Sequence, residues 1–400
     1  MSQQRLPRSA PGGDLVAAVA DLWPSAVPGQ ESGPVQARFC VVPAAGGVGT
    51  ALPLDSPRAS ARAVRRFNAA ATTPAVAKRL MLAAALRMGA GRLLPASFEV
   101  AGPDTDSLAR LLDTVFGEPV TFSVAIGTAR VNRKRVLEVF GERGDTLGFV
   151  KLGGSSVSDA DVAAEAAALP HLTTSALPGL SVPQVLWSGS WRGAQLLVIT
   201  AVPQSPRQRR VDRRDPPLPE IAELTDAFAE GPFALTTSGW WERTESRLAA
   251  LADESRRVRA LACLEVLGAR ADEPVPFAAW HGDWTPWNMA RHLGGLSLWD
   301  WERFSTGVPA GLDVWHYLLN ARLAGALEPE TALAVLRDGE SFWRALGERV
   351  AHDPEVGIGM YLAEILARYL PLAEGAGGDV ILSRTDALLT AWEAWASAQR

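Results

Sequence analysis

The sequence predicts an α+β fold with two lobes, a small lobe built on an antiparallel sheet and a larger helical lobe, preceded by an N-terminal extension. From Pro119 onward, short runs of alternating apolar and polar residues are separated by tight turns, which is the pattern of antiparallel strands. Beyond Pro219 nearly every segment has helical periodicity, apart from residues 277–304. The predicted boundaries are 1–118 for the extension (mostly helical with a short strand), 119–203 for the small lobe and 204–400 for the helical lobe.

The composition excludes several classes of protein. The chain has 400 residues, of which 48% are hydrophobic and 21% charged, so it has ample material for a globular core. Its net charge of −5 argues against binding nucleic acid by bulk charge, and two cysteines are too few for a disulfide framework. The N-terminus lacks an apolar signal core, and no apolar run approaches the roughly 20 residues of a transmembrane helix. We therefore expect a cytoplasmic protein.

The N-terminal extension contains a strongly basic stretch. A helix is predicted at Asp14–Leu22 and a strand at Val35–Val42, and helical periodicity then runs from Ser56 to about Arg92. This last stretch contains no acid and the following basic residues: Arg58, Arg62, Arg65, Arg66, Lys78, Arg79, Arg87 and Arg92. It could contact an anionic membrane surface or a phosphorylated partner. The alternative, which we favour, is a solvated helical face packed on the small lobe.

The small lobe is predicted to contain five strands and one helix. The strands are Val120–Ile126, Arg135–Phe140, Leu147–Leu152, Gln184–Trp187 and Gln195–Ala201. The helix is Ser158–Leu169, with Ser158 as its N-cap and Pro170 ending it. Arginines and prolines in Ser205–Pro219 are typical of a linker.

The most specific chemical signal is a loop that follows Trp280. It reads His281-Gly282-Asp283-Trp284-Thr285-Pro286-Trp287-Asn288, and Asp300 follows at the end of a short apolar strand. Two aspartates and an asparagine offer only oxygen atoms, which suit Mg²⁺ when substrate phosphates complete its shell. A carboxylate that does not bind the metal can accept a proton from an attacking hydroxyl. Phosphoryl transfer needs this division of roles.

This loop and the strand order before it resemble phosphotransferases of the aminoglycoside and choline kinase type, which have a protein-kinase-like fold. The resemblance covers roughly residues 119–320 and rests on His281-Gly282-Asp283, Asn288, Asp300-Trp301-Glu302 and Asp313. It implies that Asp283 is the catalytic base or orients the acceptor hydroxyl. It also implies that Asn288 and Asp300 hold Mg²⁺, that Asp313 braces the catalytic loop, and that His281 is structural.

The small lobe supplies candidates for nucleotide binding. The phosphates of a nucleoside triphosphate need a fixed cation, usually a strand lysine held by an acid on the next helix. Lys151 and Glu165 fit these positions, because Glu165 is the one charge in an otherwise small, apolar stretch. Gly127 and Thr128 are expected over the phosphates, where this chain has one glycine instead of the three of a protein kinase. Backbone groups from Thr200 to Val202 are expected to bind adenine.

The acceptor site is less well defined. Trp284 and Trp287 could form its walls, although burial in the core is the commoner role for tryptophan. The resemblance places acceptor specificity in the helical segment Pro219–Gly268. Acids in that segment are interspersed instead of massed, so a polycationic aminoglycoside acceptor is not indicated.

These observations favour a kinase that uses ATP or GTP and Mg²⁺ to phosphorylate a hydroxyl of a small molecule such as a sugar or polyol. Two alternatives stay open. One is a kinase for Ser or Thr of a peptide, docked by the basic N-terminal region. The other is a catalytically silent nucleotide-binding scaffold, which is disfavoured because every expected catalytic position is filled.

Overall fold

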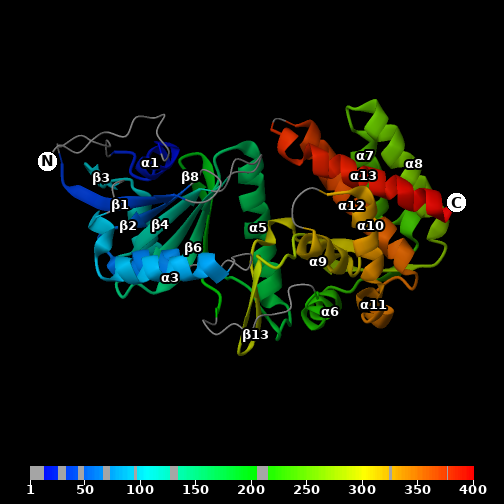
Figure 1. Ribbon diagram of the computed structural model, residues 1–400, viewed down its shortest axis with the longest axis horizontal. Coiled ribbons are helices and arrows are strands. Elements are labelled where there is room, and N and C mark those ends of the chain that lie inside the picture. The colour runs from blue at the N-terminus through cyan, green and yellow to red at the C-terminus, as the bar shows by residue number, and fades with distance from the viewer. Residues whose placement is uncertain are drawn as a thin grey trace. The chain divides into compact units, whose positions relative to one another are not determined.

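The structure is a computed structural model that describes residues 13–25, 33–43, 49–65, 73–93, 97–126, 134–204, 215–323, 327–375 and 377–400. The chain divides into two compact units, which are described separately below (Figure 1). Unit 1 contains Met1–Ala166 and Pro183–Val202, and unit 2 contains Ala167–Val182 and Pro203–Arg400. The first is built on a sheet and the second is mainly helical, which confirms the predicted fold class.

An antiparallel sheet of eight strands forms unit 1, in the order β3-β1-β2-β4-β5-β6-β9-β8. Its strands are β1 Val35–Pro43, β2 Gly49–Pro53, β3 Ser97–Ala101, β4 Thr121–Ile126, β5 Arg135–Phe140, β6 Thr146–Leu152, β8 Val185–Trp191 and β9 Ala194–Thr200. All five strands predicted for the small lobe are present. Strand β8 is longer than predicted, because the turn that follows it is confined to Arg192 and Gly193, both with positive φ.

Residues before 118 contribute three strands to this same sheet. Strand β2 pairs with β4, with Thr50 opposite Ala125, and β1 lies between β2 and β3. Neither β2 nor β3 was predicted, because strands of five residues are too short to show a clear alternation. The predicted boundary between 118 and 119 therefore falls inside one continuous sheet.

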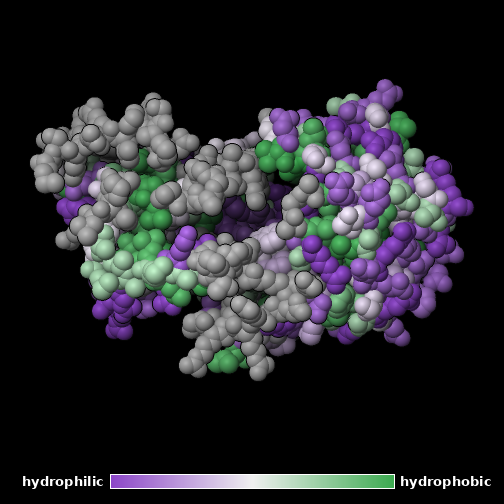
Figure 2. Space-filling model, in the orientation of Figure 1, coloured by the Kyte–Doolittle hydropathy of each residue, from purple (hydrophilic) through white to green (hydrophobic). Residues whose placement is uncertain are grey.

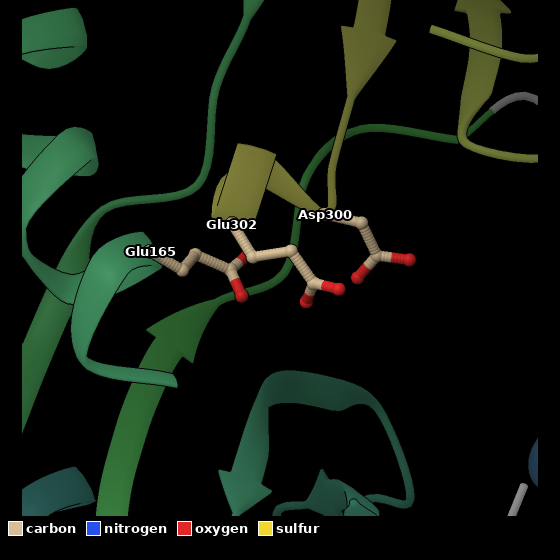
Figure 3. Close-up of side chains that lie close together, drawn as sticks. All are labelled: Glu165, Asp300 and Glu302. Atoms are coloured by element: carbon tan, nitrogen blue, oxygen red, sulfur yellow. The ribbon is translucent and has the colours of Figure 1, made fainter. Parts of the chain in front are cut away.

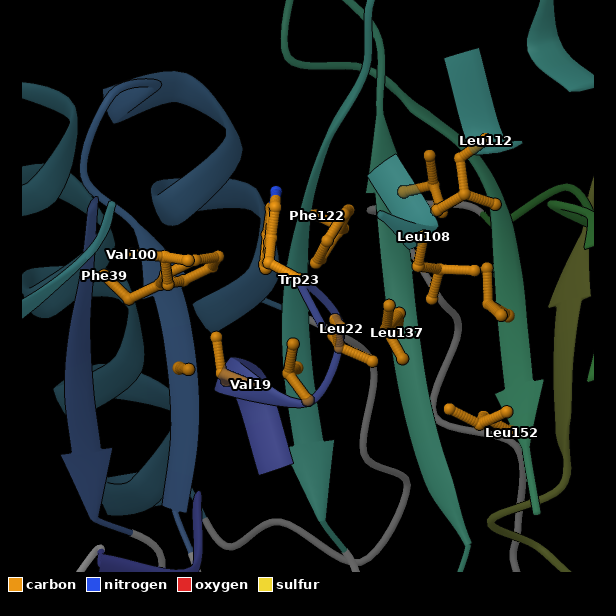
Figure 4. Packing of buried hydrophobic residues seen from close by; sticks show 14 of the residues in the cluster. Val19, Leu22, Trp23, Phe39, Val100, Leu108, Leu112, Phe122, Leu137 and Leu152 are labelled. Carbon is orange, nitrogen blue, oxygen red and sulfur yellow. The ribbon is translucent and has the colours of Figure 1, made fainter. Parts of the chain in front are cut away.

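Helices cover both faces of the sheet, since neighbouring strand residues point to opposite sides. On one face Phe39 and Val150 pack with Leu22 and Trp23, which follow α1 (Gly13–Ala20), and with Leu108 of α4 (Leu108–Phe116) (Figure 4). On the other face Cys40 packs with α2 (Pro57–Val64) and α3 (Thr73–Arg87), and the short 3₁₀ helix η1 (Ala90–Leu93) follows. The basic stretch therefore buries its alanine- and leucine-rich side on the sheet, as expected.

Helix α5 (Ser156–Thr174) departs from its predicted boundaries. Ser158 lies inside the helix, although its hydroxyl still accepts hydrogen bonds from the N–H groups of Gly154 and Ser155. Pro170 also lies within the helix and is exposed, so water can solvate the carbonyl that loses its partner. The hydroxyl of Thr174 donates to the Pro170 carbonyl (3.0 Å) and helps the helix to continue.

Unit 2 contains two small sheets and the remaining helices. The sheets have the orders β10-β11-β14 and β12-β13-β7. The strands are β7 Leu180–Ser181, β10 Gly231–Phe233, β11 Val275–Trp280, β12 Met289–His292, β13 Gly295–Leu298 and β14 Ser305–Pro309. The helices are α6 Leu218–Ala227, η2 Leu235–Thr237, α7 Gly239–Ala249, α8 Glu254–Arg270, η3 Trp301–Arg303, α9 Leu312–Arg322, α10 Pro329–Asp338, α11 Glu340–Arg344, η4 Gly347–Arg349, α12 Pro354–Glu374 and α13 Asp379–Gln399. Most of the predicted linker lies outside the described residues.

Helix α12 forms the centre of unit 2. The stretch Gly347–Glu374 is long and apolar enough, by length and composition, to span a membrane. This stretch was not predicted from the sequence. However, 78% of its most apolar window is buried inside the structure, as in the core helix of a globular domain. It is therefore weak evidence for a membrane span.

Candidate active site

The loop that carries the chemical motif begins where β11 ends. Gly282 adopts a positive φ of 76°, and a Cβ atom there would lie 2.4 Å from the carbonyl oxygen of Arg303. Both the conformation and the close approach require glycine. The backbone therefore turns sharply before Asp283.

Asp313, in the first turn of α9, holds this turn in place. Its carboxylate accepts hydrogen bonds from the N–H groups of His281 (2.7 Å) and Gly282 (3.1 Å). Burial raises the pKa of Asp313 to about 7, against the opposing effect of these two donors. The bracing contact that the family resemblance implied is thus present in the structure.

His281 is fully buried and links the loop to the strand that precedes Asp300. Its Nδ1 accepts from the N–H of Asp283 (3.1 Å), so its Nε2 must donate to the carbonyl of Trp299 (3.1 Å). Burial lowers the pKa of His281 to about 4, which keeps the ring neutral near pH 7. These contacts fit a structural histidine.

The carboxylate of Asp283 is held from two sides. The side-chain amide of Asn288 donates to Oδ2 of Asp283 (2.9 Å) and also to its backbone carbonyl (3.0 Å). Oδ1 lies 3.2 Å from Nε2 of His316. The Asp283 side chain is 38% exposed, so a substrate can still reach it. The structure therefore shows an oriented but accessible carboxylate.

The contact with His316 was not predicted from the sequence. His316 is buried on α9, and its other ring nitrogen lies 3.4 Å from the hydroxyl of Tyr361 on α12. Burial lowers the pKa of His316, so the neutral ring donates from Nε2 to Asp283. The sequence could have indicated this contact, because His316 is three residues after Asp313 and residues three apart lie on the same face of a helix.

The two parts of the motif meet through β12 and β13. Met289 pairs with Leu298, and the N–H of Trp299 donates to the Asn288 carbonyl (3.0 Å). Asp300 follows in the left-handed region, with φ 66°, and this strained conformation is typical of functional sites. Carboxylate oxygens of Asp300 and Glu302 lie within 4.8 Å of each other. Figure 3 shows both side chains.

Arg368 on α12 contacts the same loop at Gly282. Its guanidinium donates to the Gly282 carbonyl (2.7 Å) and lies 4.7 Å from the centre of the Trp280 ring. It also forms an ion pair with Glu364 (3.3 Å), which accepts from Nε1 of Trp240 (2.7 Å). Sequence reasoning did not identify this network, because Arg368 and Glu364 lie far from the motif along the chain.

The two candidate acceptor tryptophans differ. Trp284 is fully buried and packs near His281, so it belongs to the core and cannot wall an open acceptor site. That prediction was wrong for Trp284. Trp287 is 43% exposed and remains a candidate.

Unit 1 contains the predicted ion pair. Nζ of Lys151 lies 2.6 and 2.5 Å from the two carboxylate oxygens of Glu165, and both side chains are buried. Lys151 faces away from Val150 and Leu152, which pack on the opposite side of the sheet. Gly127 and Thr128 lie outside the described residues.

The predicted hinge follows β9. The N–H of Thr200 donates to the Gln184 carbonyl (2.9 Å), and the N–H of Ala201 donates to the Leu147 carbonyl (3.1 Å). Both groups are therefore used within the protein. A nucleobase would have to bind through Val202 or through carbonyl groups.

A cavity of about 330 Å³ lies beside the catalytic loop within unit 2. Its walls include Trp240, Arg243 and Arg247 of α7, Ser305 to Val308 of β14, and Glu364 of α12. Nε1 of Trp280 donates to the Ser305 hydroxyl (2.9 Å), and Arg368 joins Glu364 to Gly282. The cavity is therefore linked to the catalytic loop indirectly, through Trp280 at the end of β11 and through Arg368.

A model of the phosphotransferase enzyme family matches residues 144–351, just over half of the chain. The matched region includes Lys151, Glu165, the loop from His281 to Asn288, Asp300 and His316, and it ends before α12. The chain belongs to this family. It is therefore a phosphotransferase.

Several solved structures are similar to this phosphotransferase. The apo form of a thermostable mutant of an aminoglycoside phosphotransferase is 15% identical, with a TM-score of 0.45, over 73% of this chain and 99% of that one. A choline/ethanolamine kinase family protein from Mesorhizobium loti is 14% identical (TM-score 0.42; 71% and 94%). A spectinomycin phosphotransferase in complex with ADP and spectinomycin is 11% identical (TM-score 0.43; 73% and 97%). No curated protein matches the phosphotransferase.

Proposed function

We propose that this phosphotransferase transfers the γ-phosphoryl group of ATP or GTP to a hydroxyl group of a small molecule of the sugar or polyol class, with Mg²⁺. The observation that carries the proposal is the environment of Asp283. Its carboxylate is accessible, each of its oxygens accepts one hydrogen bond, and its loop is fixed by Asp313 and Arg368. A carboxylate oriented in this way suits the reaction, because phosphoryl transfer depends mainly on positioning.

Asp283 is proposed to act on the acceptor hydroxyl. As the acceptor oxygen forms its bond to the γ-phosphorus, the bond from that phosphorus to the bridging oxygen breaks and the nucleoside diphosphate leaves. The hydroxyl proton passes to Asp283. Asn288 and His316 occupy one lone pair on each carboxylate oxygen, so an unused lone pair can accept the proton.

Asn288, Asp300 and Glu302 offer a donor set that fits a magnesium ion. Both amide hydrogens of Asn288 point to Asp283, which turns its amide oxygen toward other partners. The carboxylate oxygens of Asp300 and Glu302 lie close enough to act on one ion. Oxygen donors with two carboxylates are the chemistry that Mg²⁺ prefers. When bound, the ion would neutralise charge on the phosphates.

Lys151 is proposed to bind the nucleotide phosphates, and Glu165 to hold the lysine in its productive conformation. The support is their buried ion pair, since a lysine in a sheet core needs a partner carboxylate to remain charged. Thr200 to Val202, Gly127 and Thr128 remain our candidates for further nucleotide contacts. For the nucleobase, the free N–H is expected from Val202.

The cavity beside the loop is our candidate for the acceptor site. It is lined by Trp240, by two arginines, by Glu230 and the already paired Glu364, and by the hydroxyls of Thr244, Ser305 and Thr306. Hydrogen-bonding groups of both kinds suit a hydroxylated acceptor.

The decisive experiment is transfer of labelled phosphate from γ-labelled ATP into fractions of a small-molecule extract and into peptide fractions. We expect Mg²⁺-dependent label in small-molecule fractions with the native enzyme and none with Asp283→Asn. Label in peptide fractions alone would instead identify a protein kinase. Absence of transfer into both, with intact folding, would contradict the proposal.

A further inference from the structure

Five arginines surround one groove in unit 1, on the opposite face of the sheet from α1 and α4. The groove has a volume of about 430 Å³ and lies between α2, α3 and the turn that connects β5 to β6. Arg58 and Arg62 come from α2, Arg65 caps the C-terminal end of α2, Arg87 comes from α3 and Arg143 from the turn. The single acid in its wall is Asp145.

The arginines of the groove differ from other arginines on the surface. Arg38, Arg192 and Arg349, for example, each pair with a carboxylate. Among the residues that the structure describes, none of the five groove arginines forms an ion pair with a carboxylate. Arg62 donates to the Thr146 hydroxyl (3.3 Å), which in turn donates to buried Glu138. The counter-charge of the groove is therefore largely missing from the described chain.

This arrangement has an energetic cost. Arg58 and Arg62 are four residues apart on α2, and Arg62 and Arg65 three apart, so like charges repel along one helix face. Helix α2 also lies close to the turn between β5 and β6. Arg58 packs against Gly144 of that turn, whose φ is 76°. The protein, whose net charge is −5, thus concentrates positive charge in this groove, which favours an anionic ligand.

The shape of the groove restricts its ligand. Guanidinium groups come from three different elements around one hollow, whereas a membrane would need them on one plane. The floor contains Ala61, Ala83 and Ala84, with Leu80 at the side. In Figure 2 the surface at the position of α3 in Figure 1 is pale green and bordered by purple, hydrophilic residues. The volume of the groove, about 430 Å³, is within the range of small-molecule sites.

We propose that this groove binds a small soluble molecule that carries several phosphate groups. Planar guanidinium groups form paired hydrogen bonds with phosphate oxygens, and five of them match a compact polyphosphate better than a single carboxylate. The groove lining includes neither Lys151 nor Asp283, so the proposal does not depend on the proposed function.

The test is calorimetric titration of the full chain with inositol hexakisphosphate, a compact polyphosphate without a nucleobase, in EDTA so that no magnesium assists binding. The test variant is Arg62→Gln with Arg143→Gln, and the matched control is Lys78→Gln with Arg79→Gln. The control removes the same charge from the same basic stretch, outside the groove wall. We expect the test variant to weaken binding by about tenfold or more and the control by less than about threefold. Because repulsion is relieved, the Tm of the unliganded test variant should be unchanged or higher.

Three outcomes would overturn the proposal. One is absence of binding to the native protein, or a loss of affinity in the control variant equal to that in the test variant. An equal loss would indicate attraction by bulk charge only. Another is a loss of binding in the double variant Lys151→Met with Glu165→Leu, with none in the groove variant, which would place the polyphosphate in a nucleotide site. The third is sedimentation with phosphatidylserine vesicles that depends on Arg62 and Arg143 and is not displaced by the polyphosphate, which would identify a membrane surface.

Discussion

Nε2 of His316 donates a hydrogen bond to Oδ1 of Asp283 over 3.2 Å, from a buried position on α9. This bond leaves the half-exposed carboxylate little freedom to rotate. It connects Asp283 to the helix that Asp313 also occupies, so α9 fixes both the backbone of the loop and the side chain of Asp283.

His316→Leu should lower kcat by about 10–100-fold, because a hydrogen bond to a charged group is lost, while KM for the nucleotide changes little. His316→Gln places an amide N–H near the former Nε2 and should retain most of the turnover. Steady-state kinetics and Tm on both variants check this. Equal losses in the two variants at native Tm would exclude a role for this hydrogen bond.

Asp283→Asn and Asp300→Asn should fail in different ways. Removing the proton acceptor at Asp283 should lower turnover by about 10²–10⁴-fold and leave nucleotide affinity intact. Removing charge at Asp300 should weaken both Mg²⁺-dependent nucleotide binding and turnover. Calorimetry with Mg·ATP distinguishes them. The reverse pattern would show that we have exchanged the two roles.

The buried pair of Lys151 and Glu165 should be costly to break from one side. Lys151→Met leaves a buried carboxylate without its lysine and is expected to destabilise the protein by about 3–5 kcal/mol. Lys151→Met combined with Glu165→Leu should recover much of that stability but no activity. Urea unfolding and a phosphate-transfer assay together provide the test. Recovery of activity in the double variant would show that the reaction does not need Lys151.

His281 and Asp313 should make opposite contributions to the pH dependence of stability. The pKa of His281 is about 4 in the folded protein and 6.5 ordinarily, so acidification from 6.5 to 4 protonates the unfolded chain first and lowers the free energy of unfolding. The pKa of Asp313 is about 7 against 3.8, so acidification from 7 to 3.8 protonates the folded protein first and raises that free energy.

Single variants should separate these contributions. Relative to the native protein, Asp313→Asn should lose more stability between about pH 7 and pH 5, and His281→Asn should lose less. Urea unfolding at both pH values measures the difference for each variant. Parallel changes in the two variants would contradict the assigned pKa directions.

The sequence predicted well those features that local patterns determine. Strands β5 and β6 followed from alternation, and the short strand before Asp300 from its apolar residues. Lys151 and Glu165 were paired correctly because strand and helix periodicities could be combined. All of these depend on short segments of the chain.

Features that depend on distant contacts could not be predicted. Pro170 was expected to end a helix, but its exposed position allows the helix to continue. Arg368 reaches Gly282 across 86 residues of sequence, and no local pattern indicates that contact. Trp284 was offered as a ligand wall although its side chain completes the core. Burial is decided by the assembled fold.

The addition of β1, β2 and β3 to the sheet has a consequence for solubility. The family match begins at residue 144, in the turn after β5, so a fragment cut there would expose a long row of unpaired backbone groups along β6. In the intact chain that side of the sheet ends instead at β3, a strand of five residues. Its Glu99 binds Arg38 of β1 and places charge on the free edge, which discourages another chain from adding a strand. The N-terminal residues thus protect the sheet from aggregation.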